Sequence, residues 1–311
     1  MMLWIFLSTV IGHSYCHSLT PPKSILFSVN QTLSKRSLTV APTTKNIVPV
    51  YWHVVHHNEL HKLTPDTVFH QINQMNKAYN GSTLYFQLAG INYINDKNLV
   101  HLECCETPEE KLLKSTHRKF GKETLNIYSA DSGYHNKVGT VWQSKKSSVS
   151  WSTFPDSELS MDGLVISTDR LSYNEKLPTT LIHESGHFFG LLHTFRGGCD
   201  DPNNDYVSDT SPADESSRSS KNGQNAVSWT WQCNVPQKTC INSPGDVITS
   251  FMDYTDCRQS FTPGQHTRIE YFRFNYRNSQ KTCQFGSSAN PCWPLIANFA
   301  SHVTGYFNKL I

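Results

Sequence analysis

Three histidines and a glutamate share one short segment, and this segment constrains the fold more than any other feature of the chain. The segment TTLIHESGHFFGLLHTFRGGC covers residues 179–199 and places His183 and His187 four positions apart. Side chains at i and i+4 project from the same face of an α-helix, so the two imidazoles can bind one ion. The spacing therefore predicts a helix that presents a pair of metal ligands.

The third histidine follows a glycine. On a straight helix His193 would face away from His183 and His187. Gly190 can adopt a positive φ at little cost, which breaks the helix and turns His193 back toward the other two. Three histidine ligands leave the fourth position of a tetrahedral zinc ion to water, as in catalytic rather than structural sites. The pattern predicts one catalytic Zn²⁺.

Glu184 is not needed as a ligand. Next to the first ligand, it can take a proton from the attacking water and pass it to a leaving amine. The alternative is a group of core histidines in an apolar helix. That arrangement would leave three histidines and a glutamate unpaired in apolar surroundings, which is costly. The complete spacing HExxHxxGxxH favours the metal interpretation.

A second segment, SFMDYTDC at residues 250–257, supports this interpretation. Its Met252 lies 59 positions after His193, and the segment resembles the Met-turn of metzincin metalloproteases, in which a methionine lies beneath the zinc-binding histidines. An ordinary core methionine is the alternative for Met252. Tyr254, two residues further on, can stabilise the oxyanion of a tetrahedral intermediate.

Three segments together resemble the pappalysin family of metzincins (peptidase family M43), in particular its compact secreted branch, the cytophagalysins. They are HESGHFFGLLHTFRGGC, DYVSDT and FMDYTDCRQSFTPGQHTRI. The resemblance covers about residues 160–270, with strands in fitting order back to about residue 47. It implies a zinc metalloendopeptidase with His183, His187 and His193 as ligands. It also implies that Glu184 is the general base, Met252 the Met-turn residue and Tyr254 the transition-state tyrosine.

The same resemblance implies disulfides in the loop-rich lower part of the fold. The order of the cysteines suggests the pairs Cys199–Cys240 and Cys233–Cys257. Four cysteines then remain unassigned: Cys104, Cys105, Cys283 and Cys292. We expect the adjacent Cys104 and Cys105 to have different partners.

Some relatives also bind calcium near the DYVSDT segment. Asp205, Asp209 and Thr210 offer suitable oxygen donors for Ca²⁺, although such a turn needs no ion. In latent relatives a cysteine of the pro-segment blocks the zinc ion. The upstream candidate here is Cys16, which we expect to be lost with the signal peptide.

The N-terminus has the features of an export signal. An apolar stretch at residues 3–11 precedes a polar one, as in a secretory signal peptide, although the usual positive charge is missing. A buried N-terminal strand is the alternative. We assign residues 1–17 to the signal peptide and residues 18–46, with the dibasic Lys35-Arg36, to a pro-segment or flexible arm.

The remaining cysteines agree with export. Eight follow Cys16, none in a CxxC pair, and an even number fits disulfides in an oxidising compartment better than a cytosolic zinc cluster. Asn30 and Asn80 begin sequons that permit glycosylation. We therefore predict a secreted, extracellular protein.

Hydrophobic periodicity predicts an α+β fold of the metzincin type. Thr64 is positioned as a helix cap with Pro65 in the first turn. We expect strands over 48–54, 83–94, 124–130 and 162–168, and a helix over 264–277. Two long helices would back a twisted mixed sheet in an upper subdomain, with an irregular disulfide-tied lower subdomain and the substrate cleft between them. The catalytic domain would span residues 47–282, followed by a C-terminal tail at 283–311.

Charge and hydropathy exclude several partners. With 27 basic and 25 acidic residues, the net charge of +2 gives no reason to expect nucleic acid. Beyond the N-terminus, no segment approaches the roughly 20 apolar residues that span a bilayer. The basic stretch at 114–122 fits a solvated surface. We expect a monomer that acts on proteins or peptides.

Two alternatives to an endopeptidase are open. A zinc hydrolase of a non-peptide amide could use the same chemistry, but the Met-turn argues against it. A catalytically silent binding protein could keep a protease fold. The intact Glu184 argues against that, because loss of this carboxylate is the simplest route to inactivity.

Overall fold

The computed structural model describes Leu26 and residues 45–138, 141–171, 179–201, 203–214, 233 and 237–278, with the side chains of 134–147 excepted. The predicted signal peptide (1–17), most of the predicted pro-segment with Asn30, and the tail at 283–311 lie outside the described residues. So do Cys16, Cys283 and Cys292.

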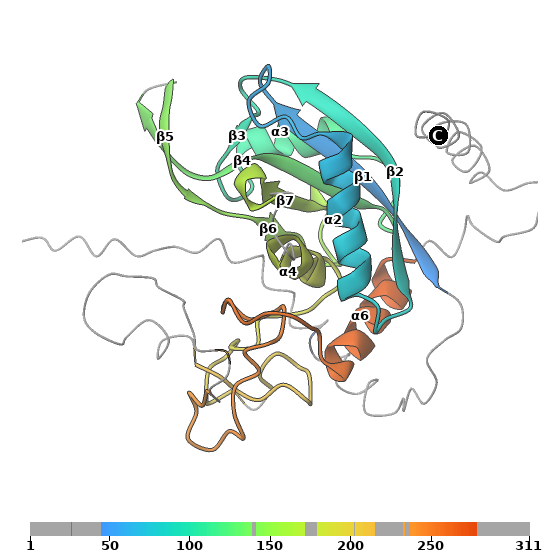
Figure 1. Ribbon diagram of the computed structural model, residues 1–311, viewed down its shortest axis with the longest axis vertical. Helices are drawn as coiled ribbons and strands as arrows, with labels where there is room; N and C mark the ends of the chain where they lie inside the picture. Colours follow the sequence, from blue (N-terminus) through green and yellow to red (C-terminus); the bar gives the residue numbers. More distant parts are fainter. Residues whose placement is uncertain are drawn as a thin grey trace, which may run out of the picture.

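A mixed seven-stranded sheet forms the framework (Figure 1). Its main path runs β2-β1-β4-β7-β6, and both β3 and β5 also pair with β4. The strands are β1 (Asn46–His56), β2 (Leu84–Asn95), β3 (His101–Leu102), β4 (Leu125–Val138), β5 (Val141–Ser148), β6 (Trp151–Ser152) and β7 (Leu164–Ser167). Strands β2, β1, β4 and β7 are parallel, whereas β6 and β5 run antiparallel to their neighbours. The mixed sheet predicted from the sequence is confirmed.

The helices are α2 (Pro65–Ala78), α3 (Pro108–His117), α4 (Thr179–Phe188) and α6 (Pro263–Tyr276), with short 3₁₀ turns η1 (Leu159–Met161) and η2 (Thr168–Arg170). Helix α2 starts as predicted, because the side chain of Thr64 accepts a hydrogen bond from the Thr67 amide at 3.2 Å and Pro65 follows it. Within the described residues, no helix is both long enough and apolar enough to cross a membrane.

Alternating side chains of the strands build a core on each face of the sheet. Val50 and Trp52 of β1 join one core, which also contains apolar residues of α2 and α4. Val55 of the same strand joins the other core together with Leu113 of α3. Helices α2 and α4 therefore cover one face and α3 the other. This places the histidine-bearing α4 directly on β6 and β7.

The expected solvated surface at residues 114–122 is wrong at Lys114 alone, because every other residue of this segment is exposed or half-buried. Lys114 is fully buried, and its Nζ lies 2.8 Å from Glu110 Oε1 and donates to the Met161 carbonyl at 3.0 Å. Arg118 pairs with the buried Asp162 at 3.3 Å. These two basic side chains each pair with a buried carboxylate. The sequence could not show this, because their acidic partners are contributed partly by η1 and its flanks.

Strand β4 also extends beyond the predicted end at residue 130. It continues to Val138 and pairs antiparallel with β5. The extension DSGYHNKV lacks the apolar alternation that marked the first half of the strand, so periodicity alone could not reveal it.

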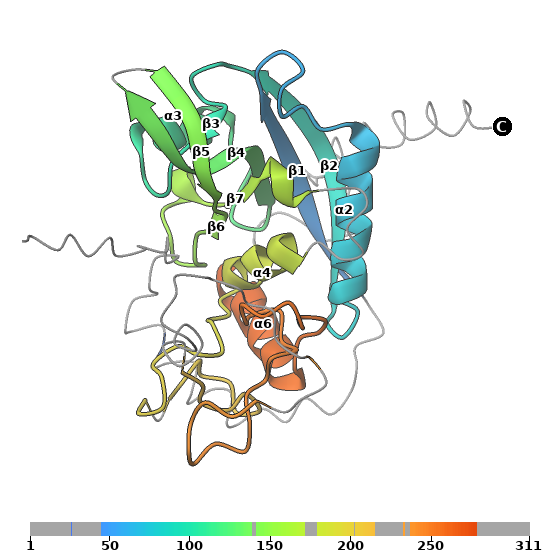
Figure 2. The same cartoon turned by 60° about the vertical axis from the view of Figure 1, so that its left-hand side comes forward.

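Below the sheet, the described residues between α4 and α6 (189–201, 203–214, 233 and 237–262) form an irregular segment without a helix or strand (Figures 1 and 2). Disulfides join Cys199 to Cys240 and Cys233 to Cys257, with Cα atoms 5.4 Å and 5.3 Å apart. These are the two pairs that the family resemblance implies. In both views α4 lies between the sheet and this irregular segment.

The expectation of different partners for Cys104 and Cys105 is wrong, because the structure joins them to each other. They follow β3 in the turn before α3. The other four described cysteines are already paired in the irregular segment. Among the described cysteines, Cys104 and Cys105 are thus paired with each other.

His53 in β1 is a buried polar residue of the sheet. Its side chain is fully buried, with Nε2 3.0 Å from Asn126 Oδ1 and Nδ1 3.4 Å from Asn92 Nδ2. A neutral ring satisfies both contacts by donating from Nε2 and accepting at Nδ1. Burial lowers the pKa of His53 to about 4, and the nearby charges of His117, Lys119 and Arg118 add to the effect.

We predict that His53 makes the fold acid-sensitive. The unfolded ring takes up a proton near pH 6.5, whereas the folded ring does so only near pH 4. The stability is therefore present above pH 6.5 and is lost as the pH falls toward 4. Between pH 7 and pH 5 the free energy of unfolding should fall by about 2 kcal/mol more in the wild type than in His53→Gln. Denaturant titrations at both pH values measure this, and an equal fall in the two proteins would contradict it.

Candidate metal centre

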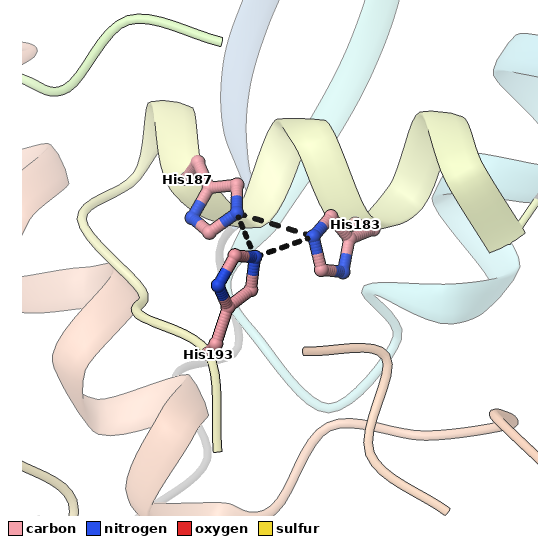
Figure 3. A group of neighbouring side chains, drawn as sticks. All are labelled: His183, His187 and His193. Atoms are coloured by element: carbon pink, nitrogen blue, oxygen red, sulfur yellow. Dashed lines mark hydrogen bonds between the residues drawn. The ribbon is translucent and has the colours of Figure 1, made fainter. Parts of the chain in front are cut away.

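Helix α4 brings two histidines to one point. His183 and His187 are buried on the same face, with their Nε2 atoms 3.1 Å apart (Figure 3). The helix packs through Leu181, Ile182 and Phe188 into the core beneath the sheet. The apolar side chains of α4 therefore fix the axis on which both imidazoles are held.

Gly190 ends this helix as predicted. Its φ is +83°, and the Leu191 and Gly190 amides donate to the carbonyls of Gly186 at 2.9 Å and His187 at 2.8 Å. These two bonds form a Schellman motif, which satisfies the last carbonyls of a helix and reverses the chain. The reversal places His193 Nε2 3.1 Å from His187 Nε2 and 3.2 Å from His183 Nε2. The predicted break and its consequence for His193 are confirmed.

Hydrogen bonds at Nδ1 fix the ring orientations of the two helical histidines. His183 Nδ1 lies 2.7 Å from the Phe251 carbonyl, and His187 Nδ1 lies 2.8 Å from the Leu191 carbonyl. A carbonyl can only accept, so each Nδ1 carries a proton and each Nε2 presents a lone pair to the centre. Burial lowers the pKa of His187 to about 4 and that of His183 well below its usual value. Both rings are therefore neutral near pH 7.

The three nitrogens fit a zinc ion. A tetrahedral ion with Zn–N distances of about 2.0–2.1 Å holds its ligand nitrogens roughly 3.3 Å apart, and the observed separations are 3.1 Å, 3.1 Å and 3.2 Å. Lone pairs that converge this closely repel one another unless a cation lies between them. Within the described part of the chain, this is the one group of three or more histidine, cysteine or acidic side chains close enough to share an ion.

Glu184 lies on α4 next to the first histidine and is buried. Burial raises its pKa to about 8, and the charge of Arg258 opposes this rise. A divalent cation at the histidines would lower this pKa further, because it favours the carboxylate form. The group is thus placed in surroundings where its proton affinity suits proton transfer near neutral pH.

Met252 lies directly under α4. It is fully buried, and a Cβ atom added to Gly186 would be 2.5 Å from its Sδ, so the glycine makes room for the methionine. The turn is tied to the segment after the third histidine, because the Thr194 amide donates to the Met252 carbonyl at 3.2 Å and the Thr194 hydroxyl to Asp253 Oδ2 at 2.8 Å. The methionine and its turn therefore hold His193 in register with α4.

Tyr254 lies at the side of the centre that solvent reaches. Its ring centroid is 4.7 Å from that of His193 and 5.6 Å from that of His183. Tyr254 and His193 are each half-buried, whereas His183 and His187 are buried. A substrate would therefore approach the three histidines from the side of Tyr254.

Arg268 of α6 and Arg277, which directly follows α6, bind the end of α4, and no sequence motif indicates them. Arg268 Nε donates to the Gly190 carbonyl at 2.8 Å, and Arg277 Nε donates to the Phe188 carbonyl at 3.1 Å. Both side chains are buried. Positive charge at the C-terminus of a helix favours its dipole and caps its free carbonyls. These contacts therefore stabilise the helix end on which His193 depends.

The three residues considered for calcium separate into two groups. Thr210 Oγ1 donates to Asp205 Oδ1 at 2.6 Å. Asp209 instead accepts from the Thr262 hydroxyl at 2.7 Å and the Gly264 amide at 2.8 Å, at the start of α6. Asp205 Oδ2 is buried without a hydrogen-bond partner, and burial raises the pKa of this carboxyl group to about 7.

Metallohydrolases activate water with converging imidazoles and a nearby carboxyl group, as in this site. Comparison with known proteins identifies the family. The Peptidase_M43 family model, described as pregnancy-associated plasma protein-A, matches residues 117–273. An extracellular metalloprotease of Neurospora crassa is 31% identical over 261 residues, covering 79% of this chain and 80% of the relative. Another from Colletotrichum graminicola is 30% identical over 266 residues, covering 80% and 84%. The chain belongs to the M43 (pappalysin) family and is an extracellular metalloprotease.

Solved structures agree on the fold. Mature mirolysin of Tannerella forsythia, in complex with a cleaved peptide, superposes with a TM-score of 0.52 at 20% identity, covering 74% of this chain and 92% of mirolysin. A promirolysin variant gives 0.55 at 19% identity and covers 81% and 87%. The metzincin-type fold expected from the sequence is thereby confirmed.

Gly190→Ala tests how far the centre depends on the end of α4. An alanine in the left-handed region costs about 1–2 kcal/mol, and its Cβ would overlap the Phe272 ring, which adds about 1–3 kcal/mol. We expect the free energy of unfolding to fall by about 2–5 kcal/mol in total. The zinc content of the purified protein should also fall. Chemical denaturation and metal analysis measure the two effects.

Gly198→Ala is the matched control. Gly198 has a φ of +66°, but a Cβ there would meet nothing within 4 Å. Only the conformational cost of about 1–2 kcal/mol should remain, with the zinc content unchanged. Equal losses in the two variants would contradict the role assigned to Gly190.

Proposed function

We propose that the protein is a zinc-dependent endopeptidase in which His183, His187 and His193 hold one catalytic Zn²⁺. One observation carries the proposal: three Nε2 atoms lie within 3.2 Å of one another, and the Nδ1 contacts of two rings direct their lone pairs to the same point. Half-buried Tyr254 and His193 leave one side of this point accessible to a substrate.

The residues of the chain supply the proton transfers and the orientation. When bound, zinc supplies a Lewis acid that polarises the substrate carbonyl and makes water more acidic. The Glu184 carboxylate accepts a proton from the attacking water and delivers it to the amine nitrogen of the leaving group. The Tyr254 phenol donates a hydrogen bond to the substrate oxygen on which negative charge develops. Met252 supports the histidines from below.

The substrate is proposed to be a protein or peptide, bound between the sheet and the irregular segment. The mirolysin structure with a cleaved peptide supports this by analogy of fold. A hydrolase of non-peptide amides would need a differently shaped binding site around the same catalytic groups. A silent binding protein would have no use for a buried Glu184 next to the histidines. A monomeric state stays a prediction.

We also propose calcium as a second ion, now restricted to the loop of Asp205. Asp205 Oδ2 and Asn204 Oδ1 are both buried without a hydrogen-bond partner, and Ca²⁺ prefers such oxygen ligands. The charge of Arg268 acts on the same carboxylate and opposes a cation there. Asp209, engaged at the start of α6, is less suited to the ion than the sequence suggested.

Glu184→Ala should abolish the cleavage of casein while the protein still binds one zinc ion per chain, because the residue moves protons and is not a ligand. Chelation should inactivate the wild type, and added zinc should restore it. Fluorescent casein assays and metal analysis measure these results. Glu59→Ala, which removes a surface carboxylate paired with Lys62, should keep full activity. Full activity of Glu184→Ala, or of the chelated enzyme, would refute the mechanism.

Tyr254→Phe should lower kcat by about 100-fold with little change in KM, because the hydrogen bond it removes strengthens only in the transition state. Steady-state kinetics with a quenched fluorescent peptide measures both constants. Tyr93→Phe is the control. Tyr93 is an exposed residue of β2 whose hydroxyl donates to the Leu63 carbonyl. Removal of this hydroxyl should leave kcat unchanged. A Tyr254→Phe enzyme with wild-type kcat would rule out this role.

A further inference from the structure

A small group of apolar side chains beside the metal centre forms a cluster of its own. Phe154, Leu192 and Leu26 are buried together, and half-buried Tyr206 packs against them. In the described part of the chain, these four residues are separate from both cores of the sheet. Phe154 follows β6, which ends the main path of the sheet, whereas Leu192 and Tyr206 lie in the irregular segment. The cluster therefore spans the two parts of the fold between which we place the substrate.

This cluster adjoins the zinc-binding histidines. The ring centroid of Phe154 lies 5.6 Å from that of His187, with the two ring planes inclined by 68°. Leu192 directly precedes His193 in the chain. One residue of an extended peptide covers about 3.3 Å. A peptide that lies across the three histidines can therefore place a side chain on Phe154 and Leu192 from a position about one to three residues from the scissile bond.

Leu26 reaches this cluster from outside the predicted catalytic domain. It belongs to the predicted pro-segment (18–46), and its side chain is only 4% exposed because it rests on Phe154 and Leu192. Removal of that segment would uncover these two apolar side chains beside the centre. Apolar side chains that are grouped and accessible next to a catalytic centre are typical of a ligand-binding surface. Leu26 therefore shows which kind of side chain fits this surface.

We propose that Phe154, Leu192 and Tyr206 form a substrate subsite that selects a leucine-sized apolar side chain, and that Leu26 occupies this subsite in the unprocessed chain. This inference rests on the proposed endopeptidase function. Burial of an apolar side chain against other apolar side chains is favourable. A polar or charged side chain would lose its hydration there, and Phe154 and Leu192 have no polar side-chain atoms to replace it.

Quenched fluorescent peptides test the selection. They carry Leu, Ser or Asp at one position, which is varied over about three residues on each side of the scissile bond. At one of these positions the wild type should have a kcat/KM about tenfold higher for Leu than for Ser, and lowest for Asp. Phe154→Ala should bring the Leu-to-Ser ratio close to one, and Phe154→Leu should keep a preference for Leu. Phe69→Ala removes a ring from the exposed side of α2 and, as the control, should keep the wild-type ratio.

A binding measurement tests the occupation of the subsite by Leu26. The parent protein is Glu184→Ala, which lacks the proposed general base and so cannot process itself. Adding Leu26→Ser should make it bind the Leu peptide about tenfold more tightly, because the peptide no longer has to displace Leu26. Adding Leu60→Ser instead, which removes an exposed leucine elsewhere, should leave the affinity unchanged. Fluorescence anisotropy measures the affinities, and intact mass establishes that residue 26 is present.

Metal analysis and thermal denaturation establish that each variant is folded. Three results would overturn the inference and leave the proposed function intact. They are equal cleavage of Leu and Ser peptides at every position, an unchanged ratio in Phe154→Ala, and an unchanged affinity on Leu26→Ser. A wild type that cleaves neither these peptides nor casein would refute the proposed function, and the inference with it.

Discussion

The whole centre depends on how one helix ends. Gly190 reverses the chain after α4 in a left-handed conformation, and that reversal decides whether His193 meets the two helical histidines. Arg268 and Arg277 then bind the carbonyls at this helix end. A local backbone preference and a distant pair of charges thus act on the same few carbonyl groups.

The remaining structure makes this arrangement rigid. One face of the sheet packs on α2 and α4, so the axis of the histidine helix is fixed by the same core that holds the strands together. From below, Met252 fits against Gly186, and the Phe251 carbonyl fixes the ring of His183. Precise ligand geometry therefore comes from ordinary packing and backbone hydrogen bonds that meet around α4.

The sequence predicted what local patterns determine. Helical spacing gave His183 and His187, the glycine gave the turn to His193, and apolar alternation gave the central strands. It could not predict contacts between distant segments. Lys114 looked like a surface residue because its burial depends on the packing of α3 against the sheet and η1. The roles of Arg268 and Arg277 depend in the same way on where α6 lies, and no spacing rule encodes this.

The contacts that Arg268 and Arg277 make with the end of α4 also bear on the order in which the parts of the centre are synthesised. Arg268 and Arg277 follow their carbonyl partners by 78 and 89 residues. During synthesis, the ligand helix therefore leaves the ribosome long before the side chains that cap its end. Until Arg268 and Arg277 have been synthesised, the helix end at Gly190 lacks these two contacts. A nascent or truncated chain that ends before α6 thus carries all three histidines but not the arginines that bind the end of their helix.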